Sequence, residues 1–597
     1  MKNKQNLGKS QFILTFGPGS IIESVNGPRL IPSLRNGFRK TWAITGNEVE
    51  NIRMVGVVRG ISNYKNSIKF FRLPDSGTDF DYDTYIFPTW KICYESKKHK
   101  SEGYLDKPIL YQSSDDQKYC PICGNSKTST VRFICACPKG HMDEVNWHFA
   151  VHNHFNCQPR FYYWDSRSSS LADIFISCPD CPSSTNMKKI YERGQKCKSR
   201  FPEDENVFSE DDSKHVHYSK RKFGDDCGRM TVIQRQSTSL RIPYNITLLQ
   251  MENEIDNIRR IILDYNELNN FLNELFKEEN PEISHNLICA LIHDDGDKKT
   301  MENFIKSEGI RGLKKYVITD ADAANFNLID LYLEEFEILT NNDYINGDNL
   351  IKSCPINKPI NINNDEFTFS VSKVNQLRTV TAQIGYYRLL SLNKDGGDTF
   401  SNNENYKDIG YKNREDRSKW YPVVESDGEG IFITSDDDPF EKFDLQEVSN
   451  KWIENPPTET SSLFGDVVKN PKYVWWHSFS HALIRTLSYK SGYNSASIRE
   501  RVYFDENNGK GGVLLYTSNV GGDGSLGGLI GLVDNFDEIL SETFESVKSC
   551  SYDPLCIESE ISKDRVNGAA CLYCLLLPET SCEHNNKWLD RHILLGE

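Results

Sequence analysis

The sequence predicts a mixed α/β protein of several domains, in which a cysteine-rich insert interrupts layers of strands and helices. Three observations support this fold class. The chain has 597 residues, of which 38% are hydrophobic and 26% charged, enough for several hydrophobic cores. Its apolar residues change along the chain from short strand-like runs to helical spacing and back. Ten of its 17 cysteines lie in one stretch and include Cys-x-x-Cys pairs, a pattern that indicates metal binding and not disulfides.

The N-terminal part of the chain divides into three segments. Residues 1–92 contain short apolar runs separated by Gly, Asn and Pro, which predict a mixed β domain. Residues 93–235 carry the ten clustered cysteines, and we expect a compact, zinc-ribbon-like region with little regular structure of its own. Residues 236–365 are predicted to be largely helical, because apolar residues recur every three or four positions over 247–277.

The C-terminal part divides into two segments. Residues 366–464 return to strand-like runs, EFTFSVSKV, RTVTAQIGYYRLL and GEGIFITSDD, which predict a β-rich segment. Residues 465–597 alternate helical and strand patterns. In this segment WWHSFSHALIRTLSYKSGY predicts a helix and GGVLLYTS a strand. This alternation predicts a C-terminal α/β domain.

The C-terminal segment also carries the clearest site signal. Cys571, Cys574 and Cys582 lie close together, and Cys556 lies just upstream in YDPLC. Four thiolates at this spacing can close a tetrahedral zinc site that has no open coordination position. We therefore expect a structural zinc site of four cysteines that staples this domain, and not a hydrolytic centre.

Two further zinc sites are predicted within residues 93–235, each built on a Cys-x-x-Cys pair that needs two more ligands. The first set is Cys93, Cys120 and Cys123, completed by Cys135, Cys137 or His141. We adopt Cys137 in this set, although Cys137 and His141 could instead join Cys157 in another cluster. The second set is Cys178, Cys181, Cys197 and Cys227. In total we expect two or three structural Zn²⁺ ions.

The charge distribution limits where a polyanion could bind. The formal net charge is −15 and the isoelectric point is about 5.5, so a nucleic acid would need a local basic face. Two basic runs, 188–200 and 214–222, offer one, with a merely solvated surface as the alternative interpretation. The residues that we expect to contact DNA phosphates are Lys188, Lys189, Arg193 and Lys198. No apolar run is long enough to span a bilayer and no signal-peptide pattern begins the chain, so we expect a cytoplasmic protein.

The sequence offers one candidate for catalysis. His477 and His481 are spaced to share a helix face, as in zinc proteases, but Ser478 stands where the general base would be required. No GxxxxGK[ST] motif is present, so the chain has no P-loop motor. We therefore expect no enzymatic activity. A metal-dependent nuclease or hydrolase that uses the histidine pair, and a scaffold that binds only protein, are the two alternatives.

Four motifs in this order carry a family resemblance. They are QFILTFGPGSII near the N-terminus, VRFICACPKGHMDEVNW at 131–147, VNQLRTVTAQIGYYRL at 374–389 and NGAACLYCLLLPETSCE near the C-terminus. The series resembles the DrmB family of the DISARM anti-phage defence systems. The last domain also resembles the C-terminal zinc-binding domain of some bacterial helicases, including those tied to mitomycin repair.

The resemblance implies a function that composition does not reveal. It implies an accessory subunit that pairs with a DrmA-like superfamily 2 helicase/ATPase as a heterodimer and helps it to bind and recognise invading DNA. One position departs from the family pattern, because Ser96 stands where a second cysteine is expected after FPTWKIC. The first zinc site is therefore rebuilt with Cys135 or Cys137, or lost.

Overall fold

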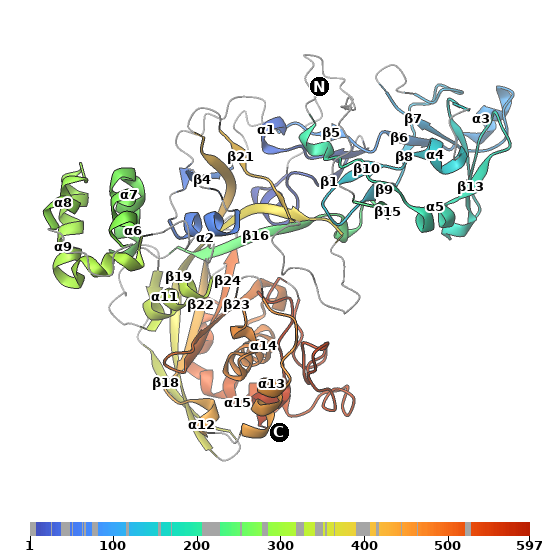
Figure 1. The fold of residues 1–597 in the computed structure, drawn as a ribbon. Helices are drawn as coiled ribbons and strands as arrows, with labels where there is room; N and C mark the ends of the chain where they lie inside the picture. The colour runs from blue at the N-terminus through green and yellow to red at the C-terminus, as the bar shows by residue number, and fades with distance from the viewer. Residues whose placement is uncertain are drawn as a thin grey trace.

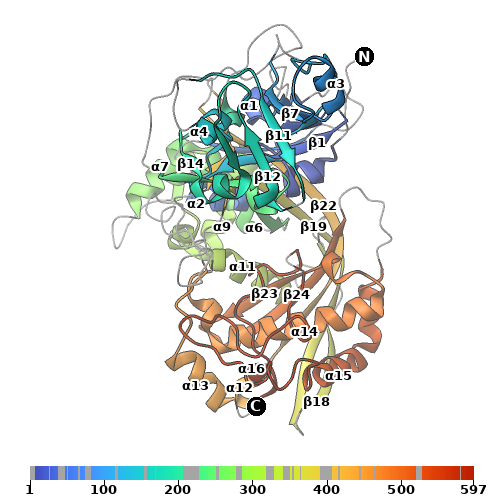
Figure 2. The same cartoon turned by 90° about the vertical axis from the view of Figure 1, so that its right-hand side faces the viewer.

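The protein is organised around a central sheet with three attached parts. The computed structural model describes residues 7–25, 27–37, 48–49, 52–62, 64, 67–73, 82–114, 119–152, 157–168, 170–205, 227–250, 254–276, 285–317, 328–340, 350–352, 355–362, 365–389, 406–413, 417–442, 445–461, 464–519, 527–578 and 580–596. Within these ranges, a Cys-rich lobe lies at one end of the sheet and a C-terminal lobe packs against the other end. A helical module projects from the side (Figures 1 and 2).

Eleven of the described strands form the central sheet, whose main order is β16–β19–β22–β24–β23. These five strands are β16 (Ile242–Leu249), β19 (Asp365–Tyr387), β22 (Lys419–Ser435), β24 (Lys510–Asn519) and β23 (Ile498–Asp505). The flanking strands are β3 (Glu48–Val49), β4 (Ile68–Arg72), β17 (Leu350–Lys352), β18 (Ile356–Ile362), β20 (Lys407–Asp408) and β21 (Tyr411–Lys412). The sheet is continuous across residue 465, where the sequence pattern had suggested a boundary.

Two long strands, β19 and β22, run through both ends of the sheet. They pair antiparallel from Phe369↔Ser435 to Ala382↔Val423. The first half of β19 also pairs with β18, and its second half pairs with β16. The runs EFTFSVSKV and RTVTAQIGYYRLL are therefore parts of one strand. A register shift between Val374 and Leu377 explains the apparent break, because the residues between them are polar.

The C-terminal lobe is built on helix α14 (Pro471–Ser491), which covers one end of the sheet. Asn470 caps its N-terminus by accepting a hydrogen bond from the backbone N–H of Lys472, and Gly492 ends it in a left-handed conformation (φ 74°). The helix is apolar nearly all round. Phe479 stacks on Phe369 of β19 with ring centroids 5.1 Å apart. The other helices of the lobe are α12 (Pro439–Lys442), α13 (Gln446–Glu454), α15 (Phe536–Val547) and α16 (Arg591–Leu595).

The Cys-rich lobe contains more regular structure than the sequence predicted. One sheet has the order β13–β12–β11–β7–β6–β8 and a second has the order β10–β9–β15–β14. The strands of the first are β6 (Trp90–Cys93), β7 (Ile109–Gln112), β8 (Ser129–Thr130), β11 (Tyr162–Ser166), β12 (Ile174–Ser177) and β13 (Ser184–Asn186). Those of the second are β9 (Phe133–Ala136), β10 (Met142–Glu144), β14 (Gln195–Lys196) and β15 (Arg229–Gln234). Such short strands give little alternation, which is why the expectation of little regular structure was wrong.

Three short helices complete the Cys-rich lobe: α3 (Ser96–Ser101), α4 (Trp147–His152) and α5 (Met187–Arg193). Trp147 and Trp164 meet edge to face in its core, with ring centroids 5.8 Å apart. Aromatic packing and the cysteine clusters therefore both stabilise these small sheets.

The helical module consists of α6 (Glu254–Asp264), α7 (Asn266–Leu275), α8 (His285–Ala290) and α9 (Asp295–Gly312), which enclose a small core of their own. The helix predicted over 247–277 begins later than expected, because Ile242–Leu249 pairs with β19 as strand β16. Helix α11 (Leu328–Thr340) instead packs on the central sheet. Its Glu335 forms a fully buried ion pair of 2.8 Å with Arg501 of β23.

The N-terminal segments attach the Cys-rich lobe to the central sheet. They comprise a short helix (Gln11–Thr15), β1 (Ile21–Ser24), β2 (Gly27–Leu30), α1 (Leu34–Gly37), α2 (Ile52–Ser62) and β5 (Tyr85–Ile86). The guanidinium of Arg388, directly after β19, donates hydrogen bonds to the carbonyls of Gly19, Gly140 and Leu240. Among the described helices, none combines the length and the apolar composition that a membrane crossing requires.

Candidate metal centres

In the part of the chain that the structure describes, five groups of side chains each bring four candidate ligand atoms within 4.8 Å of one another. We name each group by its composition or by one member. The C-terminal four-cysteine cluster is Cys550, Cys556, Cys571 and Cys574. The His99 cluster is Cys93, His99, Cys120 and Cys123, and the His141 cluster is Cys137, His141, Cys197 and Cys227. The His152 cluster is His152, Cys157, Cys178 and Cys181, and the Glu500 cluster is His477, His481, Glu500 and Cys582.

The spacing within the clusters of cysteine and histidine fits tetrahedral zinc. With Zn–S bonds of about 2.3 Å and Zn–N bonds of about 2.0–2.1 Å, two sulfurs lie about 3.8 Å apart and a sulfur and a nitrogen about 3.5 Å apart. The Sγ atoms of Cys556 and Cys574 are 3.7 Å apart, and the Sγ of Cys197 lies 3.5 Å from Nδ1 of His141. Such clusters offer four protein ligands each and leave no position for a substrate.

One predicted member of the C-terminal four-cysteine cluster was wrong. It contains Cys556, Cys571 and Cys574 as expected, but its fourth member is Cys550, whose Sγ lies 3.4 Å from that of Cys571. Cys582, the predicted fourth ligand, belongs to the Glu500 cluster. Cys550 stands six positions before Cys556 in SCSYDPLC, so its spacing was a usable signal that the shorter motif YDPLC does not contain.

Local backbone geometry supports thiolates in this cluster. The backbone N–H groups of Tyr552 and Tyr573 donate to the Sγ atoms of Cys550 and Cys571, each at 3.4 Å. Burial would raise the pKa of Cys571, but the hydrogen bonds that its sulfur receives outweigh burial and lower it. Burial raises the pKa of Cys574 to about 11, so a cation is required to keep this thiol ionised at neutral pH.

The His99 cluster resolves the open question of the fourth ligand. Cys93, Cys120 and Cys123 come together as predicted, but His99 completes the group and Cys137 does not. His99 lies on α3 with Nδ1 2.9 Å from the carbonyl oxygen of Lys107 and Nε2 3.5 Å from the Sγ of Cys120. The family pattern places a cysteine at position 96, where this chain has Ser96. His99, three residues later, is the fourth member of the cluster instead. The site is rebuilt, though not with Cys135 or Cys137.

The predicted set of Cys178, Cys181, Cys197 and Cys227 is divided between two clusters, so this grouping was wrong. Cys178 and Cys181 lie in the loop between β12 and β13, where Cys178 Sγ is 3.6 Å from Cys157 Sγ. His152, at the end of α4, is the fourth member of that His152 cluster. His152 stands five positions before Cys157 in VHNHFNC, a spacing that the sequence analysis did not use.

The second half of the divided set forms the His141 cluster. Cys197 and Cys227 flank the β14–β15 pair and face Cys137 and His141, which follow β9. Nδ1 of His141 lies 3.3 Å from Cys137 Sγ and 3.5 Å from Cys227 Sγ. The hydrogen bond from the Cys197 thiol, helped by His141, lowers the pKa of Cys137 to about 4 despite burial. Cys137 is thus a candidate ligand here. It lies with His141, as the alternative proposed, but not with Cys157, which belongs to the His152 cluster.

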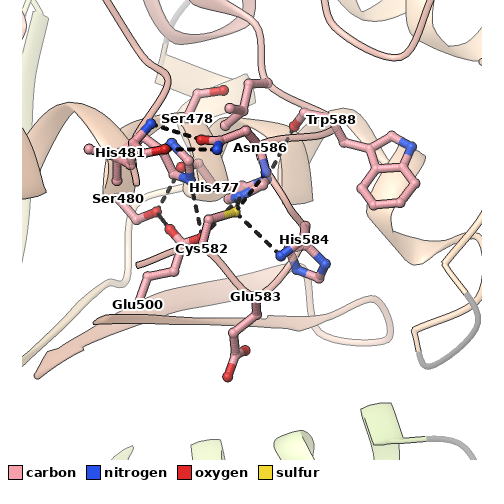
Figure 3. Close-up of polar contacts among 12 residues, drawn as sticks. His477, Ser478, Ser480, His481, Glu500, Cys582, Glu583, His584, Asn586 and Trp588 are labelled. Atoms are coloured by element: carbon pink, nitrogen blue, oxygen red, sulfur yellow. Dashed lines mark hydrogen bonds and ion pairs between the residues drawn. The ribbon is translucent and has the colours of Figure 1, made fainter. Parts of the chain in front are cut away.

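The Glu500 cluster lies in the interior of the C-terminal lobe. His477 and His481 come from one face of α14, Glu500 from β23 and Cys582 from the C-terminal loop (Figure 3). The two histidines and Glu500 have side chains that are 0% exposed. Burial lowers the pKa of His477 and raises that of Cys582 well above its usual range.

The four residues predicted to contact DNA all belong to the Cys-rich lobe. Lys188, Lys189 and Arg193 are on α5, and Lys198 follows β14. Arg193 lies over the ring of Phe149, 4.3 Å from its centroid, and both line a surface hollow with Lys189. The ammonium of Lys198 is 3.8 Å from a carboxylate oxygen of Asp143. The second basic run, 214–222, lies outside the described residues.

Comparison with known proteins accounts for most of the chain. Residues 8–242 match a domain of unknown function, DUF8724, and residues 479–575 match the MrfA Zn-binding domain. The chain is 26% identical over 559 residues to the DISARM protein DrmB of Bacillus paralicheniformis, which covers 89% of this chain and 93% of that protein. The resemblance expected from the motifs is confirmed, and the C-terminal four-cysteine cluster lies within the zinc-binding domain.

Proposed function

We propose that this chain, a DrmB-like homologue of an anti-phage defence component, acts as a non-catalytic accessory subunit of a DISARM-like complex. In this role it pairs with a DrmA-like superfamily 2 helicase/ATPase and helps it to bind invading DNA. The observation that carries the proposal is the similarity to DrmB over 89% of the chain, which is more than any one domain of the fold contains. Such extended similarity favours a shared role over a shared scaffold.

The clusters themselves support a role without catalysis. The four groups of cysteine and histidine each offer a complete set of protein ligands, so a bound zinc ion would have no open position for water or substrate. A catalytic zinc site usually has three protein ligands. The histidine pair that could serve a nuclease is 0% exposed, and a polymer substrate cannot reach it without unfolding the lobe.

A direct experiment separates this role from the nuclease alternative. Purified chain is incubated with single- and double-stranded DNA and with Mg²⁺, Mn²⁺ or Zn²⁺, with and without His481→Ala. We expect no cleavage in any combination. Metal-dependent cleavage that disappears in His481→Ala, while Glu500→Gln retains it, would establish the enzyme and exclude the accessory role.

The DNA contribution is proposed to come from helix α5 and its neighbour Lys198. The side chains of Lys188 and Lys198 are 64% and 50% exposed, and Arg193 is held against the flat ring of Phe149. Phosphate contacts of this type make binding salt-dependent, with a slope of about 0.9 per phosphate on duplex DNA. Charge reversal of all four basic residues should therefore weaken DNA binding and reduce that slope by up to about 3.6.

A matched control keeps the same change in net charge. Four lysines of the helical module are reversed instead: Lys298, Lys299, Lys306 and Lys314. We expect this control to retain the salt slope of the unaltered chain. Equal slopes for both variants would mean that α5 does not contact the phosphates.

Complex formation is tested by co-purification with a DrmA-like helicase, followed by mass photometry with and without DNA. We expect a one-to-one complex whose DNA affinity exceeds that of the helicase alone. Cross-linking to DNA distinguishes the protein-binding scaffold, which predicts that every cross-link maps to the partner. A chain that remains alone in the presence of the helicase would contradict the accessory-subunit proposal.

A further inference from the structure

We propose that the Glu500 cluster binds one structural Zn²⁺ ion, separate from the C-terminal four-cysteine cluster of the same lobe. Its four ligands are His477 Nε2, His481 Nε2, a carboxylate oxygen of Glu500 and Cys582 Sγ. Neither the family matches nor the cysteine spacing assigns this site: the MrfA Zn-binding domain match covers residues 479–575 and excludes His477 and Cys582. The inference extends beyond the accessory role and does not depend on it.

The first argument is the orientation of the two imidazole rings. Nδ1 of His477 lies 3.2 Å from the carbonyl oxygen of Trp588, and Nδ1 of His481 lies 2.8 Å from that of Leu575. A carbonyl oxygen can only accept, so each Nδ1 must carry the proton and donate it. In the neutral ring this fixes Nε2 as the atom with the free lone pair.

Both Nε2 lone pairs then converge on an atom that also cannot donate. Oε1 of Glu500 lies 3.0 Å from Nε2 of His477 and 3.1 Å from Nε2 of His481. Cys582 Sγ approaches from another side, 3.4 Å from Nε2 of His477. A Cys582 thiol could donate its S–H to Nε2 of His477, but it has only one proton. Nε2 of His481 and Oε1 of Glu500 would still face each other as electron-pair donors at 3.1 Å, with both side chains buried (Figure 3). A cation placed among these atoms would be coordinated by their electron pairs and would remove the repulsion between them.

Protons are the alternative to a metal ion. Protonation of both rings would place two imidazolium cations in the interior, with ring centroids 4.7 Å apart and one carboxylate to balance them. That arrangement buries a net positive charge, which is costly in a dry interior. A single protonated ring leaves the other Nε2 facing Oε1 without a hydrogen between them. A Zn²⁺ ion with one carboxylate and one thiolate has zero net charge.

The surroundings of the ligands match those of known metal sites. A metal-bound histidine commonly donates its other N–H to a backbone carbonyl, and both rings do so here. The backbone N–H groups of His584 and Asn586 donate to Cys582 Sγ, each at 3.3 Å, as they would to a thiolate. The Ser480 hydroxyl lies within hydrogen-bond distance of the second oxygen of Glu500 and, at 2.7 Å, of the backbone carbonyl oxygen of His477, so the first oxygen of Glu500 remains for the ion.

The distances allow zinc after a small adjustment. A tetrahedral centre needs about 3.5 Å between nitrogen and sulfur and about 3.4 Å between nitrogen and oxygen. The nitrogen–sulfur separation of 3.4 Å already agrees. The nitrogen–oxygen separations of 3.0 and 3.1 Å would each open by a few tenths of an ångström, which a rotation of the Glu500 carboxylate can provide. Nitrogen, sulfur and carboxylate donors at four positions favour zinc over magnesium or calcium.

Such an ion would join three separate parts of the lobe. It would tie helix α14 and strand β23 to the loop that carries Cys582, which follows the C-terminal four-cysteine cluster in the chain. The site has no open position and no access from solvent, so the zinc would stabilise the lobe and would not activate water.

The test compares two buried glutamates in the full chain. Glu500→Gln keeps the shape of the side chain but removes the charge, and we expect the zinc content, measured by plasma mass spectrometry, to fall by one ion per chain. Glu335→Gln is the control. Glu335 is also 0% exposed and pairs with Arg501, the residue after Glu500, but it belongs to none of the clusters. We expect this control to keep the zinc content of the unaltered chain.

An unchanged zinc content in Glu500→Gln would overturn the proposal. If that variant does not fold, the unaltered chain decides the question by anomalous diffraction above and below the zinc edge. A peak about 2.3 Å from Cys582 Sγ and about 2.0–2.1 Å from both Nε2 atoms is expected. A map with peaks at other clusters and none at this position would exclude the site.

Discussion

Arg388 connects the Cys-rich lobe to the central sheet, and its replacement should loosen that junction selectively. Its guanidinium is 0% exposed and lies 3.1 Å from Oε1 of Glu203, whose side chain is 1% exposed. It also donates to the carbonyl oxygens of Gly19, Gly140 and Leu240 at 3.0, 2.9 and 3.1 Å. Arg388→Met keeps the length of the side chain but leaves the carboxylate and three carbonyls without these donors.

The expected cost follows from burial. Removing one partner of a buried ion pair costs about 3–5 kcal/mol, because the other charge remains in the interior without compensation. Arg378 on the same strand offers a control, since its ion pair with Asp427 is 31% and 59% exposed. An exposed pair contributes about 0–1 kcal/mol, so Arg378→Met should have a much smaller effect.

A local measurement is required, because a chain with several domains does not unfold in two states. Hydrogen exchange is followed in peptides that contain Gly19 and Ser33. The N–H of Gly19 donates to Ile31 within the N-terminal segment that Arg388 binds, and the N–H of Ser33 donates to the backbone carbonyl of Glu203 across the junction. A loss of about 3–5 kcal/mol speeds their exchange by roughly 10²- to 10⁴-fold, since each 1.4 kcal/mol is a factor of ten. Equal exchange in the Arg388→Met and Arg378→Met variants would refute the reasoning that the buried pair holds the junction.

Two further predictions concern the C-terminal lobe. Cys574→Ser and Cys550→Ser should each give insoluble protein or lose one zinc ion, because a structural zinc site contributes on the order of ten kcal/mol to the folding free energy. The control is Cys289→Ser in helix α8 of the helical module, which should change neither zinc content nor solubility. A hydrogen bond to Asp590 raises the pKa of His592 above 6.5, so this pair stabilises the fold most below that pH and its contribution is lost as pH rises through the folded-state pKa. The difference in hydrogen exchange of residues 590–596 between the unaltered chain and His592→Asn, compared at matched pH, should therefore shrink as the pH rises above about 6.5, and a constant difference would contradict this assignment.

The sequence could identify a Cys-x-x-Cys pair in three of the four clusters that contain two or more cysteines, but not the complete set of partners. The three Cys-x-x-Cys pairs each lie within one cluster, since two cysteines at this spacing bend around the same point. Their partners come from distant segments, and the fold alone decides them. Cys197 and Cys227 join Cys137 because the pairing of β14, β15 and β9 brings those loop ends together. The ligand His99 had no spacing signal beyond its place near Ser96.

The fold shows the same division between local and distant information. The helix that contains His477 was predicted from its sequence, because residues 475–493 carry a helical pattern without an interrupting Gly or Pro before Gly492. The segment Ile242–Leu249 was assigned in part to a helix by spacing, yet it is a strand, because pairing with β19 stabilises it more than its local pattern does. The local sequence of this segment carries no information about its pairing with β19, which is distant in the chain.

The long strands β19 and β22 imply that the zinc-binding domain is not an independent unit in this chain. The family match begins at residue 479, in the middle of α14, and omits both strands. Yet Phe479 stacks on Phe369 of β19 and on Phe544 of α15, with ring centroids 5.1 and 5.7 Å apart, so the core of the lobe includes the sheet. The other half of β19 ends at Tyr387, just before Arg388, which binds the N-terminal segments. Strand β19 therefore belongs to the core of the C-terminal lobe at one end and leads into the junction with the N-terminal segments at the other, so the zinc-binding domain cannot be separated from the chain without dividing the sheet.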